Sequence, residues 1–203
     1  RRDHACVHEN RPGVTNGVIS PEEALERLDR ALIKMPNISV AGIAGPGDAF
    51  RAPDITMRTF EIIRRKHNDI SLCVSSNGLN IKDFIPGLRD LKVGFVTITV
   101  NAIDAGIGAR LYKEVRQDGE TLRGRVAAQT LITRQLEAIT LLKAGNFTVK
   151  VNSVVITGVN DAHMVFLARK MAELGVDLMN LLPLIPVKGT DMENVKPPGP
   201  VRM

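Results

Sequence analysis

Five short apolar runs that alternate with helical patterns constrain the fold of this chain more than any other feature. Each run is rich in β-branched or large apolar residues, which suits buried parallel strands. The runs are ISVAGIA (38–44), ISLCVSS (70–76), VGFVTITV (93–100), FTVKVNSVVI (147–156) and DLMNLLPLI (177–185). Alternation of strands with helices predicts a parallel sheet joined by right-handed crossovers. We therefore expect an α/β fold.

Helical signals fill the spaces between the runs. Ser20 is expected to cap a first helix, with Pro21 at its first position and Glu23 completing a capping box. Further helices are expected over 54–66, 80–90, 125–144 and from a cap at Asp161 to Leu174, with Gly175 after the last one. Residues 101–124 form the longest insertion between two runs, so we expect an extra lobe at the barrel mouth.

Composition favours one domain without membrane spans. The chain has 203 residues, of which 44% are hydrophobic and 24% charged, and no apolar run reaches the roughly 20 residues of a membrane span. Its two cysteines, Cys6 and Cys73, make no disulfide scaffold and favour a reducing cytoplasm. The net charge of +5 is spread along the chain and aromatic residues are few, which favours an anionic small substrate over nucleic acid.

Small polar residues and glycines gather where the predicted strands end. They are Gly45, Pro46, Gly47 and Asp48; Ser75, Ser76, Asn77 and Gly78; Thr97, Thr99 and Asn101; Asn152 and Ser153; and Asn180. In parallel α/β folds ligands bind at this edge of the sheet. Asp48 is the one carboxylate there and no histidine joins it, which favours a cofactor that carries the chemistry itself.

Several of these residues also have a purely structural explanation. The glycines and the SSNG sequence (75–78) turn the chain well, and threonines are common in strands. Cys73 suits a small core position, and Cys6 is either incidental or a metal ligand. Asn101 and Asn152 favour function, because a buried amide is costly unless it is hydrogen-bonded.

Taken together and in order, GIAGPGDA, CVSSNGLN, VTITVNAID, VKVNSVVITGVND and NLLPLIPVKGT resemble the radical SAM core of the NifB family, which makes the nitrogenase iron–molybdenum cofactor. CVHENRPGVT resembles the segment after that family's CxxxCxxC cluster motif, which is absent here. The resemblance implies a partial TIM-type (βα)6 radical SAM barrel whose first strand and cluster loop are missing from this chain. Residues 1–203 are then an N-terminally incomplete core with a Pro/Gly-rich tail over 186–203, inactive without the upstream motif.

The resemblance also implies a chemistry. The family fuses two [4Fe-4S] clusters into a carbide-centred eight-iron precursor, with one S-adenosylmethionine (SAM) as methyl donor and a second as radical source. The implied cofactors are SAM and [4Fe-4S] clusters. The implied partners are cluster substrates and carrier or scaffold proteins, without nucleic acid or membrane. A non-catalytic iron–sulfur carrier, another radical SAM enzyme and a TIM-type lyase or isomerase without iron remain the alternatives.

Residue roles follow from the same resemblance. The expected SAM-binding residues are Ala44, Gly45, Gly47, Asp48, Ser75, Ser76, Asn77, Thr99, Asn101, Asn152, Val154 and Ile156. Backbone around Ala44, Gly45 and Gly47 would receive the ammonium group of SAM, and the adenosine would be lined by Asn152, Val154 and Ile156. Cys6 and Cys73 match cysteines that ligate substrate clusters, and thiolates are the ligands such clusters need.

Overall fold

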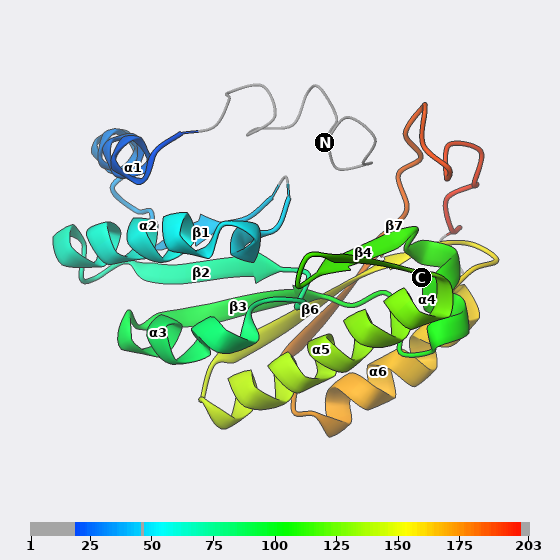
Figure 1. Ribbon diagram of the computed structural model, residues 1–203. Helices are drawn as coiled ribbons and strands as arrows, with labels where there is room; N and C mark the ends of the chain where they lie inside the picture. Colours follow the sequence, from blue (N-terminus) through cyan, green and yellow to red (C-terminus); the bar gives the residue numbers. More distant parts are fainter. Residues whose placement is uncertain (1–18, 46, 200–203) are drawn as a thin grey trace.

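Five parallel strands form a single sheet in chain order. They are β1 (Val40–Ile43), β2 (Ser71–Ser76), β3 (Val93–Thr99), β6 (Thr148–Val155) and β7 (Leu178–Pro183), ordered β1-β2-β3-β6-β7 (Figure 1). This computed structural model describes residues 19–45 and 47–199. The order never reverses, as it would in a doubly wound sheet, so the strands wind in one direction as in a barrel. The predicted parallel α/β fold is confirmed.

One helix precedes β1 and each of the others follows a strand, and together they bury one face of the sheet. They are α1 (Pro21–Lys34), α2 (Pro53–Lys66), α3 (Ile85–Asp90), α5 (Gly124–Ala144) and α6 (Met164–Glu173), with short 3₁₀ turns η1 (Ala49–Arg51), η2 (Lys82–Phe84) and η3 (Asp161–His163). Helix α1 packs against α2, and α3, α5 and α6 lie on one side of the sheet (Figure 1).

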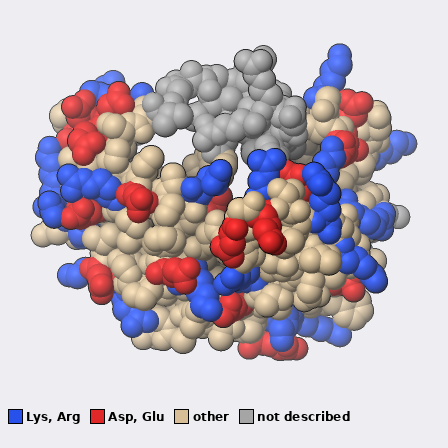
Figure 2. All heavy atoms as spheres, viewed as in Figure 1, with Lys and Arg blue, Asp and Glu red and all other residues tan. Residues whose placement is uncertain are grey.

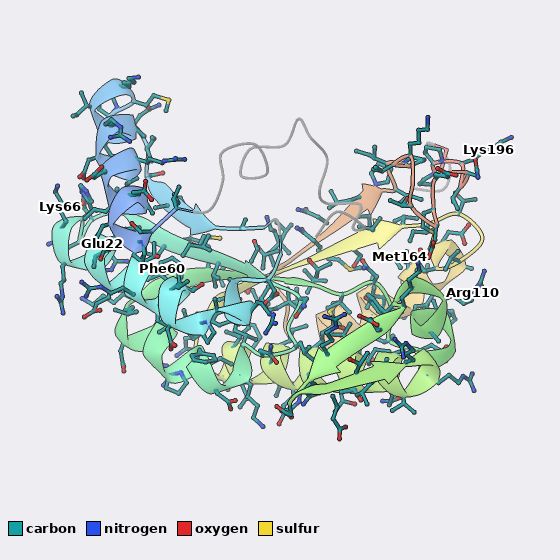
Figure 3. All side chains as sticks on the ribbon, turned by 45° about the horizontal axis from the view of Figure 1, so that its top comes forward. Glu22, Phe60, Lys66, Arg110, Met164 and Lys196 are labelled. Carbon is teal, nitrogen blue, oxygen red and sulfur yellow. The ribbon has the colours of Figure 1, made fainter. Side chains whose placement is uncertain are left out.

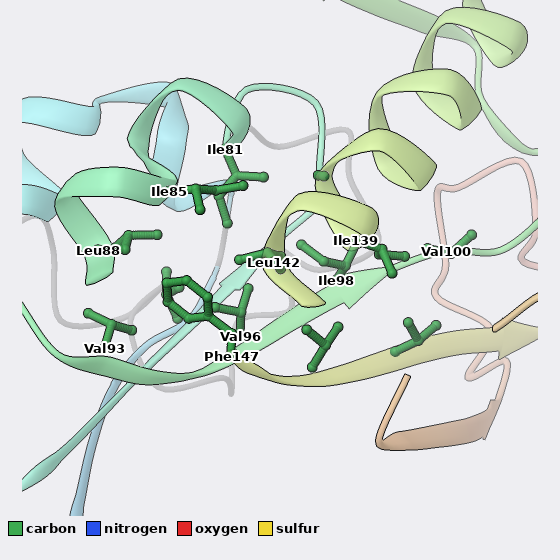
Figure 4. Close-up of a cluster of buried hydrophobic side chains, with 14 of the residues drawn as sticks. Ile81, Ile85, Leu88, Val93, Val96, Ile98, Val100, Ile139, Leu142 and Phe147 are labelled. Atoms are coloured by element: carbon green, nitrogen blue, oxygen red, sulfur yellow. The ribbon is translucent and has the colours of Figure 1, made fainter. Parts of the chain in front are cut away.

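The core lies between these helices and the sheet. Val96 and Ile98 of β3 pack in one buried cluster with Leu88 of α3 and with Ile139 and Leu142 of α5 (Figure 4). Full burial of each such side chain contributes about 1.5–3 kcal/mol. We call the side of the sheet that faces these helices the outer face.

The opposite side, which we call the inner face, carries a different set of side chains. Alternation along each strand and the strand registers place these residues on it: Val40, Gly42, Ser71, Cys73, Ser75, Phe95, Thr97, Thr99, Thr148, Lys150, Asn152, Val154, Leu178, Asn180 and Leu182. Most of them are half-buried or exposed, whereas Leu72, Val74 and Val151 of the outer face are fully buried. In a barrel this face would point to the interior.

The expected insertion is a small lobe at the carboxyl ends of the strands. Helix α4 (Ala105–Leu111) is followed by a hairpin of β4 (Glu114–Gln117) and β5 (Glu120–Arg123). Asp118 and Gly119 both have positive φ, as the two-residue hairpin turn requires. Both α4 and the hairpin pack against α5, so the lobe lies against the helical layer.

Two helix starts can be compared with their predicted caps. The capping box at Ser20 is confirmed, since Ser20 Oγ accepts from Glu23 N–H at 3.1 Å and Glu23 Oε2 accepts from Ser20 N–H at 2.9 Å. The predicted cap at Asp161 is wrong, because Asp161 lies inside η3 and its Oδ1 accepts from Gly158 N–H at 3.1 Å. Gly175 follows α6 with φ +73°, as predicted.

The surface mixes charges of both signs. Figure 2 shows Lys and Arg interspersed with Asp and Glu over the face in view. Glu22 and Lys66 lie at one end of the molecule, and Arg110 and Lys196 lie at the other, toward which the strands run (Figure 3). Within residues 19–45 and 47–199, no helix is long and apolar enough to cross a membrane.

The carboxylate of Asp177 ties the amino ends of β6 and β7 to helix α5. Asp177 Oδ2 accepts from Lys143 Nζ at 2.6 Å and from Val149 N–H at 2.7 Å. These bonds, that of Lys143 first, lower the pKa of Asp177. Its stabilisation is therefore complete above the unfolded pKa of about 4 and is lost as the pH falls through the lower native pKa.

We predict that Asp177→Asn lowers the melting temperature at pH 7, and that the difference from wild type shrinks toward pH 3. Thermal melts across that range measure it. Asp69→Asn changes an exposed aspartate and is the control. An Asp177→Asn deficit that stays constant with pH would contradict the assignment.

Candidate functional site

Asp48 joins the loop after β1 to the loop after β2. Its Oδ1 accepts from Phe50 N–H at 2.9 Å, and its Oδ2 accepts from Ser76 Oγ at 3.0 Å and from Asn77 N–H at 2.5 Å. Ser76 Oγ in turn accepts from Gly78 N–H at 3.0 Å. Both carboxylate oxygens thus hold backbone and a hydroxyl, and the two predicted ligand loops are fixed against each other. A direct cofactor contact of Asp48 or Ser76 stays a prediction.

The glycine-rich loop after β1 lies exposed above this clamp. Gly47 has φ +91°, a left-handed conformation that favours glycine. A Cβ on Gly45 would lie 3.1 Å from the Gly47 carbonyl oxygen, so the loop folds tightly on itself. Ala44, Gly45 and Gly47 are all exposed, which leaves their backbone groups accessible to a ligand.

A buried glutamine on α5, missed at the level of sequence, clamps the ends of β2 and β3. Gln135 is 1% exposed, and its Nε2 donates to Asn77 O at 2.8 Å and to Thr99 O at 2.9 Å. Gly78 has φ +84°, and a Cβ there would lie 2.9 Å from Gln135 Cγ. The available signal was a polar residue on the apolar stripe of the helix, beside Leu131, Ile132 and Ile139.

Two asparagines join the ends of β3 and β6. Asn101 Oδ1 accepts from Val154 N–H at 2.8 Å. The fully buried Asn160 donates from Nδ2 to Asn101 O and to Val154 O, both at 2.9 Å, and accepts from Ile156 N–H at 2.7 Å. Asn101 was a predicted SAM-binding residue. Its side-chain oxygen Oδ1 already accepts a hydrogen bond from the backbone of Val154. Asn160 was not singled out, although the TGVND sequence containing it was noted.

The remaining predicted residues lie on the inner face near its carboxyl edge. Thr99 pairs in register with Asn152, which pairs with Asn180, and Asn180 Nδ2 donates to Asn152 Oδ1 at 3.2 Å. Val154 is half-buried one step further along β6, and Ile156 is buried just beyond the strand. The structure therefore brings residues from four strand ends to one edge, as predicted, with Ser75 on the inner face of β2.

Cys73 lies deeper on the inner face, two residues before Ser75. Its register partners are Gly42 on β1 and Phe95 on β3. Gly42 has no side chain, so space is left beside the thiol. Burial raises the pKa of the Cys73 thiol, and the positive charge of Lys150 opposes that rise. Cys6, the other predicted ligand, lies outside the described residues.

The described residues do not supply a complete iron–sulfur ligand set. Within residues 19–45 and 47–199, no group of three or more His, Cys, Asp or Glu side chains is arranged to hold a metal ion. Cys73 is the one cysteine among them. The three-cysteine cluster of the resemblance therefore does not fit this part of the chain.

A cavity of about 500 Å³ lies away from the inner face. It is lined by residues of the loops after β1 and β2 and by the β4–β5 hairpin, among them Arg51, Phe84, Arg116 and Glu120. None of its lining residues belongs to the inner face or to the predicted ligand set. The described residues of the predicted ligand set thus lie outside this cavity.

The buried position of Gln135 makes stability sensitive to a negative charge there. Gln135→Glu places a carboxylate against two carbonyl oxygens in a buried position, which raises the pKa of the new acid. We predict a loss of about 2–4 kcal/mol of unfolding free energy at pH 8. The loss shrinks as the pH falls, because the protonated acid can donate to one carbonyl.

Urea unfolding at pH 5 and pH 8 measures this effect. Gln129→Glu, on the exposed face of the same helix, is the matched control. Equal stability of Gln135→Glu and wild type at pH 8 would show that the amide does not hold the two strand ends.

Comparisons with known proteins agree with this geometry. The model of the radical SAM superfamily matches residues 6–171. Among curated proteins, the chain is 46% identical over 200 residues to the FeMo cofactor biosynthesis protein NifB of Chlorobaculum tepidum, covering 98% of this chain and 47% of that protein. It is 41% identical over 191 residues to NifB of Klebsiella pneumoniae, covering 93% of this chain and 41% of the relative. The chain thus spans less than half the length of these relatives.

Solved structures are similar in fold at low sequence identity. Streptococcus suis SuiB gives a TM-score of 0.61 at 17% identity, over 89% of this chain and 37% of SuiB. Native anSMEcpe with bound AdoMet gives a TM-score of 0.56 at 15% identity, over 81% of this chain and 43% of that one. TsrM from Kitasatospora setae, with cobalamin and a [4Fe-4S] cluster bound, gives 0.57 at 14% identity, over 85% of this chain and 32% of TsrM.

The superfamily uses SAM and a [4Fe-4S] cluster, and its fold is the α/β arrangement described above. Three observations agree with membership of this superfamily. They are a parallel sheet wound in chain order, a glycine-rich loop after β1 and a superfamily match over most of the sequence. This chain belongs to the radical SAM superfamily.

Proposed function

We propose that this chain is the SAM-binding and cluster-binding core of an enzyme of iron–molybdenum cofactor biosynthesis. Its reaction fuses two [4Fe-4S] clusters into the carbide-centred eight-iron precursor. The observation that carries the proposal is the similarity to NifB proteins over nearly the whole chain, together with the convergence of predicted ligand residues at one edge of the sheet. Its partners are cluster substrates and the carrier or scaffold proteins that deliver them, in the cytoplasm.

The arrangement of strand ends supports SAM binding. The exposed loop of Ala44, Gly45 and Gly47 offers backbone groups to the methionyl end, at a position that the Asp48 clamp fixes. Thr99 and Asn152 offer polar groups on the inner face, and Val154 offers an apolar surface for the adenosine. SAM bound there supplies a methyl group and a radical source to the reaction. The protein's part is to orient SAM and to hold the clusters near it.

Cys73 is the proposed ligand of a substrate cluster within the described part of the chain. Its thiol lies on the inner face, below the edge of the sheet at which SAM is proposed to bind. We call this edge, formed by the carboxyl ends of the strands, the SAM edge. The thiol is beside the space that Gly42 leaves. One thiolate cannot hold a four-iron cluster alone, so the other ligands lie elsewhere, with Cys6 as the proposed second one.

Substitutions at Gly47 distinguish a loop that binds SAM from a loop that only turns the chain. In a longer protein that carries the family's cluster motif, we predict that Gly47→Val and Gly47→Asn each weaken SAM binding at least roughly tenfold, about 1.4 kcal/mol. Added side chains would block the approach of SAM to the backbone. Isothermal titration measures the affinity.

The asparagine variant supplies the control, because Asn tolerates positive φ better than other residues with a side chain. Its melting temperature is expected to stay near that of wild type. Unchanged SAM affinity of Gly47→Asn would mean that Gly47 serves only the backbone conformation of the loop.

Cys73 is tested in the same longer protein. We predict that Cys73→Ala binds fewer irons per chain after anaerobic reconstitution, forms no fused cluster and still cleaves SAM to 5′-deoxyadenosine. Folding is expected to change little, because a small, half-buried side chain is lost. Iron analysis and electron paramagnetic resonance of the reduced clusters provide the readout.

Cys73→Ser nearly keeps the size of the side chain and serves as the matched variant. A mutant of the SAM-cluster motif, which loses SAM cleavage, is the opposite control. Full iron content and product formation in Cys73→Ala would make Cys73 a core residue and contradict its role as a ligand.

A further inference from the structure

Within the described strands, Lys150 is the one charged side chain on the inner face, the side of the sheet that faces away from the helices. It lies in the middle of β6, between Thr97 on β3 and Leu178 on β7. The other inner-face residues are apolar, hydroxyl-bearing, amide-bearing or small, apart from the thiol of Cys73. Sequence reasoning did not single Lys150 out, although the alternation along FTVKVNSVVI puts it on the same side as Asn152.

The ammonium group of Lys150 has no carboxylate partner in the described part of the chain. Several other lysines are paired there, for example Lys143 with Asp177 and Lys82 with Glu137. Lys150 is half-buried, and none of its strand neighbours on the inner face carries a negative charge. A partly desolvated cation is costly unless an anion or several acceptors compensate it.

Cys73 lies on the same inner face as Lys150, two strands away. The two residues are separated by two strand spacings and are offset by one inner-face step, because Cys73 pairs with Phe95 and Lys150 pairs with Thr97. Strand spacing and rise place their Cα atoms about 12 Å apart. This separation leaves room on the inner face for a group bound between the two side chains.

We propose that Lys150 is a positioning residue for an anionic iron–sulfur cluster held at Cys73, an inference that rests on the proposed function. A thiolate-ligated [4Fe-4S] cluster carries net negative charge, and its sulfides accept hydrogen bonds. The ammonium group compensates that charge and orients the cluster on the inner face, below the SAM edge. Cys73 supplies the bond to iron, and Lys150 supplies the charge and the hydrogen bond.

The test compares three variants in the longer, SAM-cluster-containing protein, reconstituted anaerobically with iron and sulfide. Lys150→Met removes the charge, Lys150→Arg keeps it, and Lys34→Met removes an exposed positive charge from α1 as the control. We expect Lys150→Met to lose the Cys73-dependent irons several-fold faster to a chelator. We also expect the reduction potential of the cluster at Cys73 to become more negative, since a neighbouring positive charge is gone. Lys150→Arg should restore most of both properties.

Three outcomes decide the matter. Chelator resistance and potential of Lys150→Met equal to those of Lys34→Met would overturn the role of Lys150. Weaker SAM binding by Lys150→Met at unchanged iron content would overturn it too, since the anion would then be the carboxylate of SAM. If Cys73→Ala loses no iron from the otherwise wild-type protein, the proposed cluster site itself fails, which is a different result from a failure of Lys150 alone.

Discussion

Hydrogen bonds between strand ends are the constraint on which the site depends. Five strands run parallel in chain order, so all their carboxyl ends meet at one edge, where backbone groups would otherwise lack partners. Asp48 joins the ends of β1 and β2, Gln135 joins β2 and β3, and Asn160 joins β3 and β6. Side chains thus continue the pairing where the sheet stops, and they fix the loops in which the ligand residues lie.

The two faces of the sheet have different roles. The outer face and its helices supply the core, in which Val96, Ile98 and Leu142 are buried. The inner face carries few large buried side chains, and its amides, its thiol, its ammonium group and most of its hydroxyls are at least partly exposed. Alternation along β2 and β6 separates these functions residue by residue, because Val74 and Val151 face the core while Cys73 and Lys150 face inward.

Sequence patterns predicted the strands well because apolar β-branched runs are local signals. The run at 38–44 gave only Val40–Ile43, since in the described chain β1 pairs with β2 alone. The edge residues Thr99 and Asn152 were also predictable, because parallel strands bring their ends together. The clamps of Gln135 and Asn160 were not, since they join residues 58 and 59 positions apart through tertiary packing. For the same reason, the contact of Asp48 with the loop after β2 could not be inferred from the local turn.

The central claim is that SAM binds across the carboxyl ends of β1, β2, β3 and β6 with the substrate cluster beneath it. A crystal structure of the longer, cluster-loaded protein with SAM tests this most directly. The account predicts the methionyl group against the backbone of Ala44, Gly45 and Gly47, the adenosine against Asn152 and Val154, and cluster density bonded to Cys73. SAM bound away from this edge, or an unligated Cys73 in a protein that forms the fused cluster, would contradict it.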